Sequence, residues 1–151
     1  MSVTTLPDLT LPATGGKNVR LTDLRGKKAV IYFYPKDNTL GCTNQATDFT
    51  MHLPEFTAAG AVVFGISRDS VKSHEGFKAK HGLKIDLLAD IDEAACKAFD
   101  VIRPKKLYGK EVVGLVRSTF LFDADGKLAR EWRAVKVPGH VAEVLDAVRK
   151  L

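Results

Sequence analysis

The 151-residue chain has only two cysteines and lacks a long apolar run. Two cysteines, Cys42 and Cys96, are too few for the disulfide framework of a small secreted protein. No segment approaches the roughly 18 consecutive apolar residues of a membrane-spanning helix. Residues 1–8 contain neither the basic nor the apolar region of a signal peptide. We therefore expect a cytoplasmic protein without a membrane partner, in which cysteine serves thiol chemistry.

The sequence also lacks the spacing of a metal site. Its four histidines, His52, His74, His81 and His140, are scattered and do not combine with the cysteines in a zinc-binding pattern. We predict that all four are surface residues and that the protein needs no metal.

Nucleic acid is not an expected partner, although the net charge is +5 and the isoelectric point is about 9.2. The basic residues are dispersed, apart from a group within 103–110, and no basic face is interleaved with aromatic residues. A solvated basic surface explains the charge.

The pattern of apolar and turn-forming residues predicts a single α/β domain over residues 1–151. The expected fold has a central mixed β-sheet flanked by helices, with an N-terminal β-hairpin around the turn at 14–18. Buried strands are expected at 29–34, 61–66 and 85–89, and a hairpin is expected to pair 112–122 with 127–137. The first helix is expected to follow Cys42 and to end near residue 59, and further helices are expected at 71–81, 92–100 and 140–151. Residues 101–110 are expected to form a basic loop, and Pro54 to interrupt or kink the first helix.

Cys42 occupies the most informative position in the chain. It follows the strand 29–34 and a tight loop, and it lies in the first turn of the next helix. Free N–H groups and the positive end of the helix dipole favour an anion there. A thiol that is mostly ionised at neutral pH needs roughly 2.7 kcal/mol of stabilisation, whereas a helix terminus supplies about 0.3–1 kcal/mol. A cation and hydroxyl donors must therefore contribute.

The same stretch resembles a known family. Pro35, Thr39 and Cys42 have the spacing of the peroxiredoxin motif P-x-x-x-T-x-x-C, and the surrounding residues 34–43 resemble its bacterioferritin-comigratory-protein branch, also called peroxiredoxin Q. Leu40 replaces the proline usual in the family, and Gln45 replaces a common glutamate. The order of predicted elements is similar to the thioredoxin-like fold of peroxiredoxins over nearly the whole chain.

The resemblance implies a thiol peroxidase that reduces hydrogen peroxide and organic hydroperoxides. Cys42 would attack the peroxide and become a sulfenic acid, Thr39 would hold the peroxide oxygens, and Pro35 would shield the sulfur. An external thiol such as thioredoxin, glutaredoxin or glutathione would restore the enzyme. No cofactor is implied, and members of this branch are often monomers.

Arg117 supplies the expected cation. With Ser118 to Phe122 it matches the family's Arg-x-[Ser/Thr]-Phe strand, whose arginine lies beside the reactive cysteine. Without the resemblance, a surface arginine paired with an acid would be the simpler interpretation. Guanidinium keeps its charge when partly buried and presents several fixed donors, which suits both a thiolate and a peroxide oxygen.

Other interpretations of Cys42 remain open from the sequence. Free cysteines are often small buried core residues. A thioredoxin-type dithiol enzyme would need a Cys-x-x-Cys pair, but residue 45 is Gln. A thioredoxin-like binding or chaperone module, in which Cys42 is incidental, is the alternative of a different class.

Cys96 decides how the enzyme would be recycled. Many relatives carry a resolving cysteine five residues after the first, but Thr47 stands there, and residues 77–81 contain no cysteine either. Cys96 is expected on the flank of the helix 92–100, half-buried beside an apolar stripe that begins at Ile91. We predict a single-cysteine mechanism, with a Cys42–Cys96 disulfide as the alternative.

Overall fold

The computed structural model describes residues 3–107 and 109–151. The strands of the described residues are β1 Thr10–Ala13, β2 Lys17–Arg20, β3 Lys28–Phe33, β4 Ala61–Ser67, β5 Asp86–Ala89, β6 Ile102–Leu107, β7 Lys110–Leu115, β8 Ser118–Phe122 and β9 Leu128–Arg133. The helices are the 3-10 helix η1 Leu21–Leu24 and the α-helices α1 Leu40–Ala58, α2 Val71–His81, α3 Ala94–Ala98 and α4 His140–Arg149.

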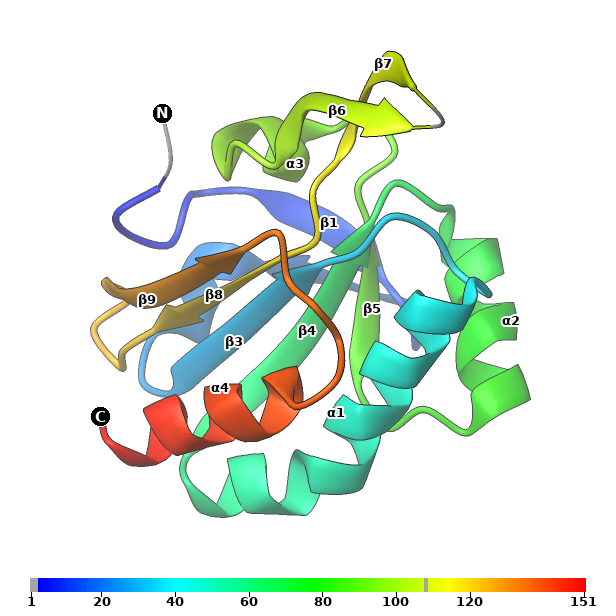
Figure 1. Ribbon diagram of the computed structural model, residues 1–151. Coiled ribbons are helices and arrows are strands. Elements are labelled where there is room, and N and C mark those ends of the chain that lie inside the picture. The colour runs from blue at the N-terminus through cyan, green and yellow to red at the C-terminus, as the bar shows by residue number, and fades with distance from the viewer. Residues whose placement is uncertain (1–2, 108) are drawn as a thin grey trace.

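The main sheet has seven strands in the order β2-β1-β5-β4-β3-β8-β9. The strands β3, β4 and β5 run parallel, while β8 and β1 pair antiparallel with β3 and β5. Figure 1 shows α4 and α1 packed along this sheet, with α2 beside α1. The predicted mixed sheet with flanking helices is confirmed, as is the N-terminal hairpin, which β1 and β2 form.

Strand β3 separates two hydrophobic cores. Its residues 29–33 are fully buried, because a strand near the middle of a sheet with both faces covered is apolar throughout. Val30 and Tyr32 belong to the core that contains α1 and α4, whereas Ile31 and Phe33 belong to the core that contains α3. Alternate side chains of one strand thus point into different cores.

The predicted basic loop at 101–110 is wrong. Residues 102–107 form β6, which pairs residue by residue with β7 in a separate two-stranded sheet; residue 108 lies outside the described residues. Pro104 suggested a loop, but proline is tolerated in a strand that has a free edge. The nonlocal pairing of β6 with β7 outweighs this local signal.

The predicted helix at 92–100 is shorter than expected. Only Ala94–Ala98 are helical, because Glu93 and Asp100 adopt left-handed backbone conformations, with φ of 64° and 55°, at the two ends. Ile91 therefore lies outside the helix and is 65% exposed rather than part of an apolar stripe.

Helix α1 is continuous through Pro54. It changes direction about half-way along its length in Figure 1, as expected for a proline that cannot donate to the preceding turn. The predicted kink is therefore confirmed, whereas the alternative of an interrupted helix is wrong.

Substitution of Gly65 tests how tightly the side chains pack against strand β4. A Cβ on this residue of β4 would lie 2.8 Å from the Tyr32 ring and 3.0 Å from Leu87 Cδ2. We expect Gly65→Ala to lower the free energy of unfolding by about 1–3 kcal/mol, measured by urea denaturation. The control is Gly76→Ala on α2, which meets nothing within 4 Å and should stabilise the helix by up to about 1 kcal/mol. Equal urea midpoints for the two variants would contradict this packing.

Candidate active site

Cys42 is the third residue of α1, in the first turn of the helix, and is only 1% exposed. The N–H group of Thr43 donates to the Thr39 carbonyl at 2.8 Å, which is the first bond of the helix. The amide of Cys42 precedes this bond, so it is one of the N–H groups that a helix leaves without an intrahelical acceptor. The sulfur therefore lies where backbone donors and the helix dipole both stabilise negative charge.

The structure places Arg117 beside this sulfur. Arg117 Nη2 lies 3.4 Å from Cys42 Sγ, although the two residues are 75 positions apart. Arg117 was expected within a strand, but it lies in the connection that precedes β8. Gly41 permits the approach, because a Cβ there would lie 3.3 Å from Arg117 Nη2. The cation that the sequence required is thus in contact with the thiol.

Gln45 orients the arginine from the next turn of α1. Its Oε1 accepts a hydrogen bond from Arg117 Nη1 at 2.7 Å, and its side chain is fully buried. A glutamate there would offset part of the guanidinium charge, whereas an amide oxygen fixes the geometry and leaves that charge available to the sulfur. The family resemblance marks Gln45 only as a departure and implies no role for it. The signal in the sequence that points to a role is its spacing of one helical turn from Cys42.

Thr39 and Pro35 flank the loop that leads into α1. Thr39 is the N-cap residue of the helix, with extended backbone and an exposed side chain. Its hydroxyl donates to the Lys36 carbonyl at 2.9 Å. Pro35 is half-buried and follows Tyr34 at the end of β3. Both residues therefore lie on the loop that leads into α1, and the Thr39 hydroxyl is engaged within that loop.

Cys96 is fully buried, so the prediction of a half-buried position is wrong. Its N–H donates to Asp90 Oδ2 at 2.7 Å, and the N–H of Ala95 donates to Asp90 Oδ1 at 2.9 Å. Burial, followed by the neighbouring Asp90 carboxylate, raises the pKa of the Cys96 thiol. Cys96 belongs to the core on the α3 side of the sheet, whereas Cys42 belongs to the core on the α1 side.

Two histidines that were predicted to lie on the surface are buried. His140 Nε2 lies 2.7 Å from the Thr119 hydroxyl, and burial lowers the pKa of His140 to about 4. His74 is completely buried and lies close to Asp37 and Asp69. The prediction failed because a histidine can be buried when distant segments supply polar partners: both ring nitrogens of His74 have one, and Nε2 of His140 has the Thr119 hydroxyl.

Comparison with known proteins identifies the family. A model of the AhpC/TSA family matches residues 4–131. Peroxiredoxin Bcp of Xanthomonas campestris is 52% identical over 142 residues, which are 94% of this chain and 89% of the relative. The chain belongs to the AhpC/TSA family. Peroxiredoxins of this family are thiol peroxidases, so the predicted resemblance and the enzyme class are confirmed.

Two further comparisons also point to peroxiredoxins of the Bcp and Q type. Peroxiredoxin Bcp of Bacillus subtilis is 48% identical over 145 residues, covering 96% of this chain and 92% of the relative. The solved structure of Xanthomonas campestris Peroxiredoxin Q has a TM-score of 0.92 and 50% identity, covering 99% of this chain and 97% of its own. The predicted thioredoxin-like peroxiredoxin fold is therefore confirmed. No helix among the described residues is long and apolar enough to cross a membrane.

The contact between Arg117 and the sulfur can be tested by alkylation of Cys42. Arg117→Ala should slow reaction with iodoacetamide at neutral pH by an order of magnitude, because the thiolate loses its countercharge. Arg117→Lys should be intermediate, since an ammonium keeps the charge but cannot contact Gln45 and the sulfur together. Arg130→Ala, at an exposed arginine stacked on Trp132, is the control and should react like the wild type. An unchanged rate in Arg117→Ala would assign the arginine a purely structural role.

Proposed function

We propose that this peroxiredoxin reduces hydrogen peroxide and organic hydroperoxides through a sulfenic acid on Cys42. The observation that carries the proposal is the contact between Cys42 Sγ and Arg117 at the N-terminus of α1. One solved structure with 49% identity concerns the alkyl peroxide reduction activity of Xanthomonas campestris bacterioferritin comigratory protein, which supports organic hydroperoxides as substrates here.

In the proposed first step, the Cys42 thiolate attacks one peroxide oxygen and the O–O bond breaks. The sulfur is oxidised to a sulfenic acid, and the second oxygen takes up a proton and leaves as water or alcohol. A thiol then attacks the sulfenic sulfur, releasing water and forming a mixed disulfide. A second thiol reduces that disulfide and restores Cys42. The two external thiols supply the two electrons that reduce the peroxide, so the proposed cycle needs no cofactor.

The proposed roles of the neighbouring residues follow from where charge develops. Arg117 stabilises the thiolate and then the negative charge that spreads onto the peroxide oxygens. Thr39, whose hydroxyl can rotate away from the Lys36 carbonyl, and the N–H of Cys42 hold the same oxygens. Pro35 shields the sulfur from water and limits further oxidation. These assignments are supported by the position of all four residues on one loop–helix junction or in contact with it.

A single-cysteine mechanism is the proposed route of recycling. The sheet lies between the core that contains Cys42 and the core that contains Cys96. A disulfide needs Cα atoms within about 7 Å, so an internal bridge would require the cores on both sides of the sheet to open. The raised pKa of the Cys96 thiol also makes it a poor attacking group. The alternative, in which Cys96 resolves the sulfenic acid, predicts a Cys42–Cys96 disulfide.

The external reductant is proposed to be thioredoxin, glutaredoxin or glutathione, acting in the cytoplasm on a monomeric enzyme. Two free thiols suit a reducing compartment. The large exposed apolar side chains among the described residues come from different segments, which supports a monomer: Leu40, Met51, Ile91, Val113 and Leu151. A thioredoxin-like binding module, the alternative of a different class, would consume no peroxide.

The nucleophile is tested by Cys42→Ser. We expect peroxide consumption to fall below a few per cent of the wild-type rate, because a serine hydroxyl is not ionised at this site and is a poor nucleophile for oxygen. The measurement is peroxide loss in the presence of excess dithiothreitol, with circular dichroism to verify folding. Activity above that level in folded Cys42→Ser would exclude Cys42 as the reactive group.

Cys96→Ser distinguishes the two routes of recycling. With glutathione and glutaredoxin as donor we expect at least half of the wild-type turnover, because the buried Cys96 takes no part. Mass spectrometry of peroxide-treated wild type, quenched with dimedone, should find Cys42 as its sulfenic acid adduct. A Cys42–Cys96 linked peptide in high yield, with turnover lost in Cys96→Ser, would establish the two-cysteine route instead.

A further inference from the structure

Leu40 is the first residue of α1 and, at 80%, the most exposed large apolar side chain among the described residues. The reactive Cys42 follows two residues later and is only 1% exposed. Single exposed apolar residues are common on protein surfaces and by themselves indicate nothing. Whether Leu40 has a role therefore depends on the demands of the fold at this position and on the surface around it.

The fold does not require leucine at the start of α1. Thr39 has φ of −83° and ψ of 153°, an extended conformation that suits the residue before a proline. The N–H group of the first helical residue has no intrahelical acceptor, so proline is favoured there. Proline, which is usual in the family, would fit and would also restrict the unfolded chain. Leu40 instead exposes apolar area to water and contributes little packing.

Leu40 begins a stripe of exposed or half-buried, uncharged side chains along the outer side of α1. This outer stripe consists of Leu40, Thr43, Asn44 and Thr47, which follow one another at helical spacing. The Thr43 hydroxyl donates to the Thr39 carbonyl at 2.8 Å, and the Thr47 hydroxyl donates to the Thr43 carbonyl at 3.0 Å. Both hydroxyl protons are thus bonded within the helix, so covering these two side chains breaks few hydrogen bonds to water.

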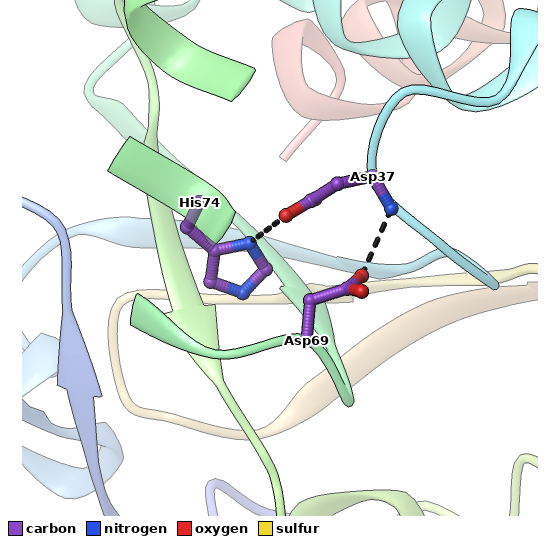
Figure 2. Close-up of side chains that lie close together, drawn as sticks. All are labelled: Asp37, Asp69 and His74. Carbon is purple, nitrogen blue, oxygen red and sulfur yellow. Dashed lines mark hydrogen bonds and ion pairs between the residues drawn. The ribbon is translucent and has the colours of Figure 1, made fainter. Parts of the chain in front are cut away.

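Residues 38–47, which include the outer stripe, contain no charged residue, although 27% of the chain is charged. The acid that precedes them, Asp37, is 4% exposed, and its Oδ2 lies 2.8 Å from His74 Nδ1. Figure 2 shows the Asp37 side chain pointing from the loop toward His74 on α2. Its carboxylate therefore bonds inside the protein rather than facing solvent. Depletion of charged residues is typical of the centre of a protein–protein interface, because charges are costly to take out of water.

A protein that exchanges thiols with Cys42 has to cover this surface. Leu40 and Cys42 are two residues apart, a rise of about 3 Å along the helix. Even small redox interfaces bury on the order of 500 Å² on each partner, so a protein bonded to Cys42 also contacts Leu40. Glutathione is a poorer fit, because it is small and carries two carboxylates and an ammonium group, for which the outer stripe offers no charged partner.

We propose that Leu40 and the outer stripe form the docking surface for a protein dithiol, which reduces the Cys42 sulfenic acid and whose surface beside its reactive sulfur is apolar. The proposal rests on the proposed function above and selects a protein over glutathione as the reductant. Leu40 acts through binding of this partner and takes no part in the reaction with peroxide. Its apolar area is removed from water only when the partner binds, so it favours the complex rather than the fold.

The reaction at this surface balances with the partner alone. One thiolate of the dithiol attacks the sulfenic sulfur, the S–O bond breaks, and the oxygen takes up protons and leaves as water. The resulting mixed disulfide joins Cys42 to the partner. The second thiolate of the partner attacks the partner's own sulfur in that disulfide, so the partner is oxidised to an internal disulfide and Cys42 is released as a thiolate. Two electrons thus pass from the dithiol to the sulfenic acid.

The experiment compares a protein dithiol with a small one. Turnover of hydrogen peroxide is measured with thioredoxin, kept reduced by thioredoxin reductase and NADPH, and separately with dithiothreitol. Formation of the Cys42 sulfenic acid is followed without any reductant by rapid quenching with dimedone. For Leu40→Ser we expect kcat/KM for thioredoxin to fall roughly fivefold or more, while the other two rates stay within about twofold of wild type. Leu40→Met keeps an apolar side chain and should retain about half or more of the wild-type kcat/KM.

Leu151→Ser is the matched control, because the same change is made at the other end of the sheet. Leu151 is 48% exposed and follows α4. Lys28 Nζ donates to the Val148 carbonyl at 3.0 Å, which places the end of α4 at the start of β3, whereas Cys42 follows the end of β3. All three rates of Leu151→Ser should equal those of the wild type, and circular dichroism verifies that each variant is folded.

The outcomes separate the docking surface from the function on which it rests. An unchanged kcat/KM for thioredoxin in Leu40→Ser, an equal loss in Leu151→Ser, or no reduction of the wild type by thioredoxin would overturn the docking surface while the proposed function stands. An equal loss with dithiothreitol would overturn it too, since Leu40 would then affect the reaction itself. Failure of the wild type to form a Cys42 sulfenic acid would overturn the proposed function and the docking surface together. A loss confined to thioredoxin, and absent in Leu40→Met, supports the proposal.

Discussion

The contact between Cys42 and Arg117 is the interaction on which the rest of the structure depends. A buried thiolate needs nearby positive charge, and a helix terminus alone supplies only about 0.3–1 kcal/mol. The sheet supplies the arginine. Phe33, the last residue of β3, pairs with Ser118, the first residue of β8. Arg117, which directly precedes Ser118, consequently lies at the end of β3 from which the chain continues to Cys42.

The same sheet keeps the two thiols of the chain apart. Alternate residues of β3 face different cores, and Cys42 and Cys96 belong to one core each. Their environments also differ chemically. Cys42 contacts a guanidinium, whereas Cys96 lies beside the Asp90 carboxylate, which disfavours a second negative charge. One fold therefore contains one cysteine suited to nucleophilic attack and one suited to packing.

The sequence alone determined the features that depend on local chemistry. Apolar runs and turn formers located the central strands, and the residues from Pro35 to Cys42 predicted a strand, loop and helix with a thiol in the first turn. These follow from periodicity and backbone preferences within a few residues. The motif also sufficed to indicate the family.

Only the tertiary structure decided the features that arise between distant segments. Arg117 and Cys42 are 75 residues apart. The family resemblance indicated this arginine, but without the resemblance the sequence favoured a surface arginine paired with an acid, and only the folded chain shows its contact with the sulfur. The burial of His74 and Cys96, and the pairing of β6 with β7, were mispredicted for the same reason. Whether a polar residue is buried or a segment becomes a strand depends on partners supplied by other parts of the chain, and those partners are brought into reach only when the sheet forms.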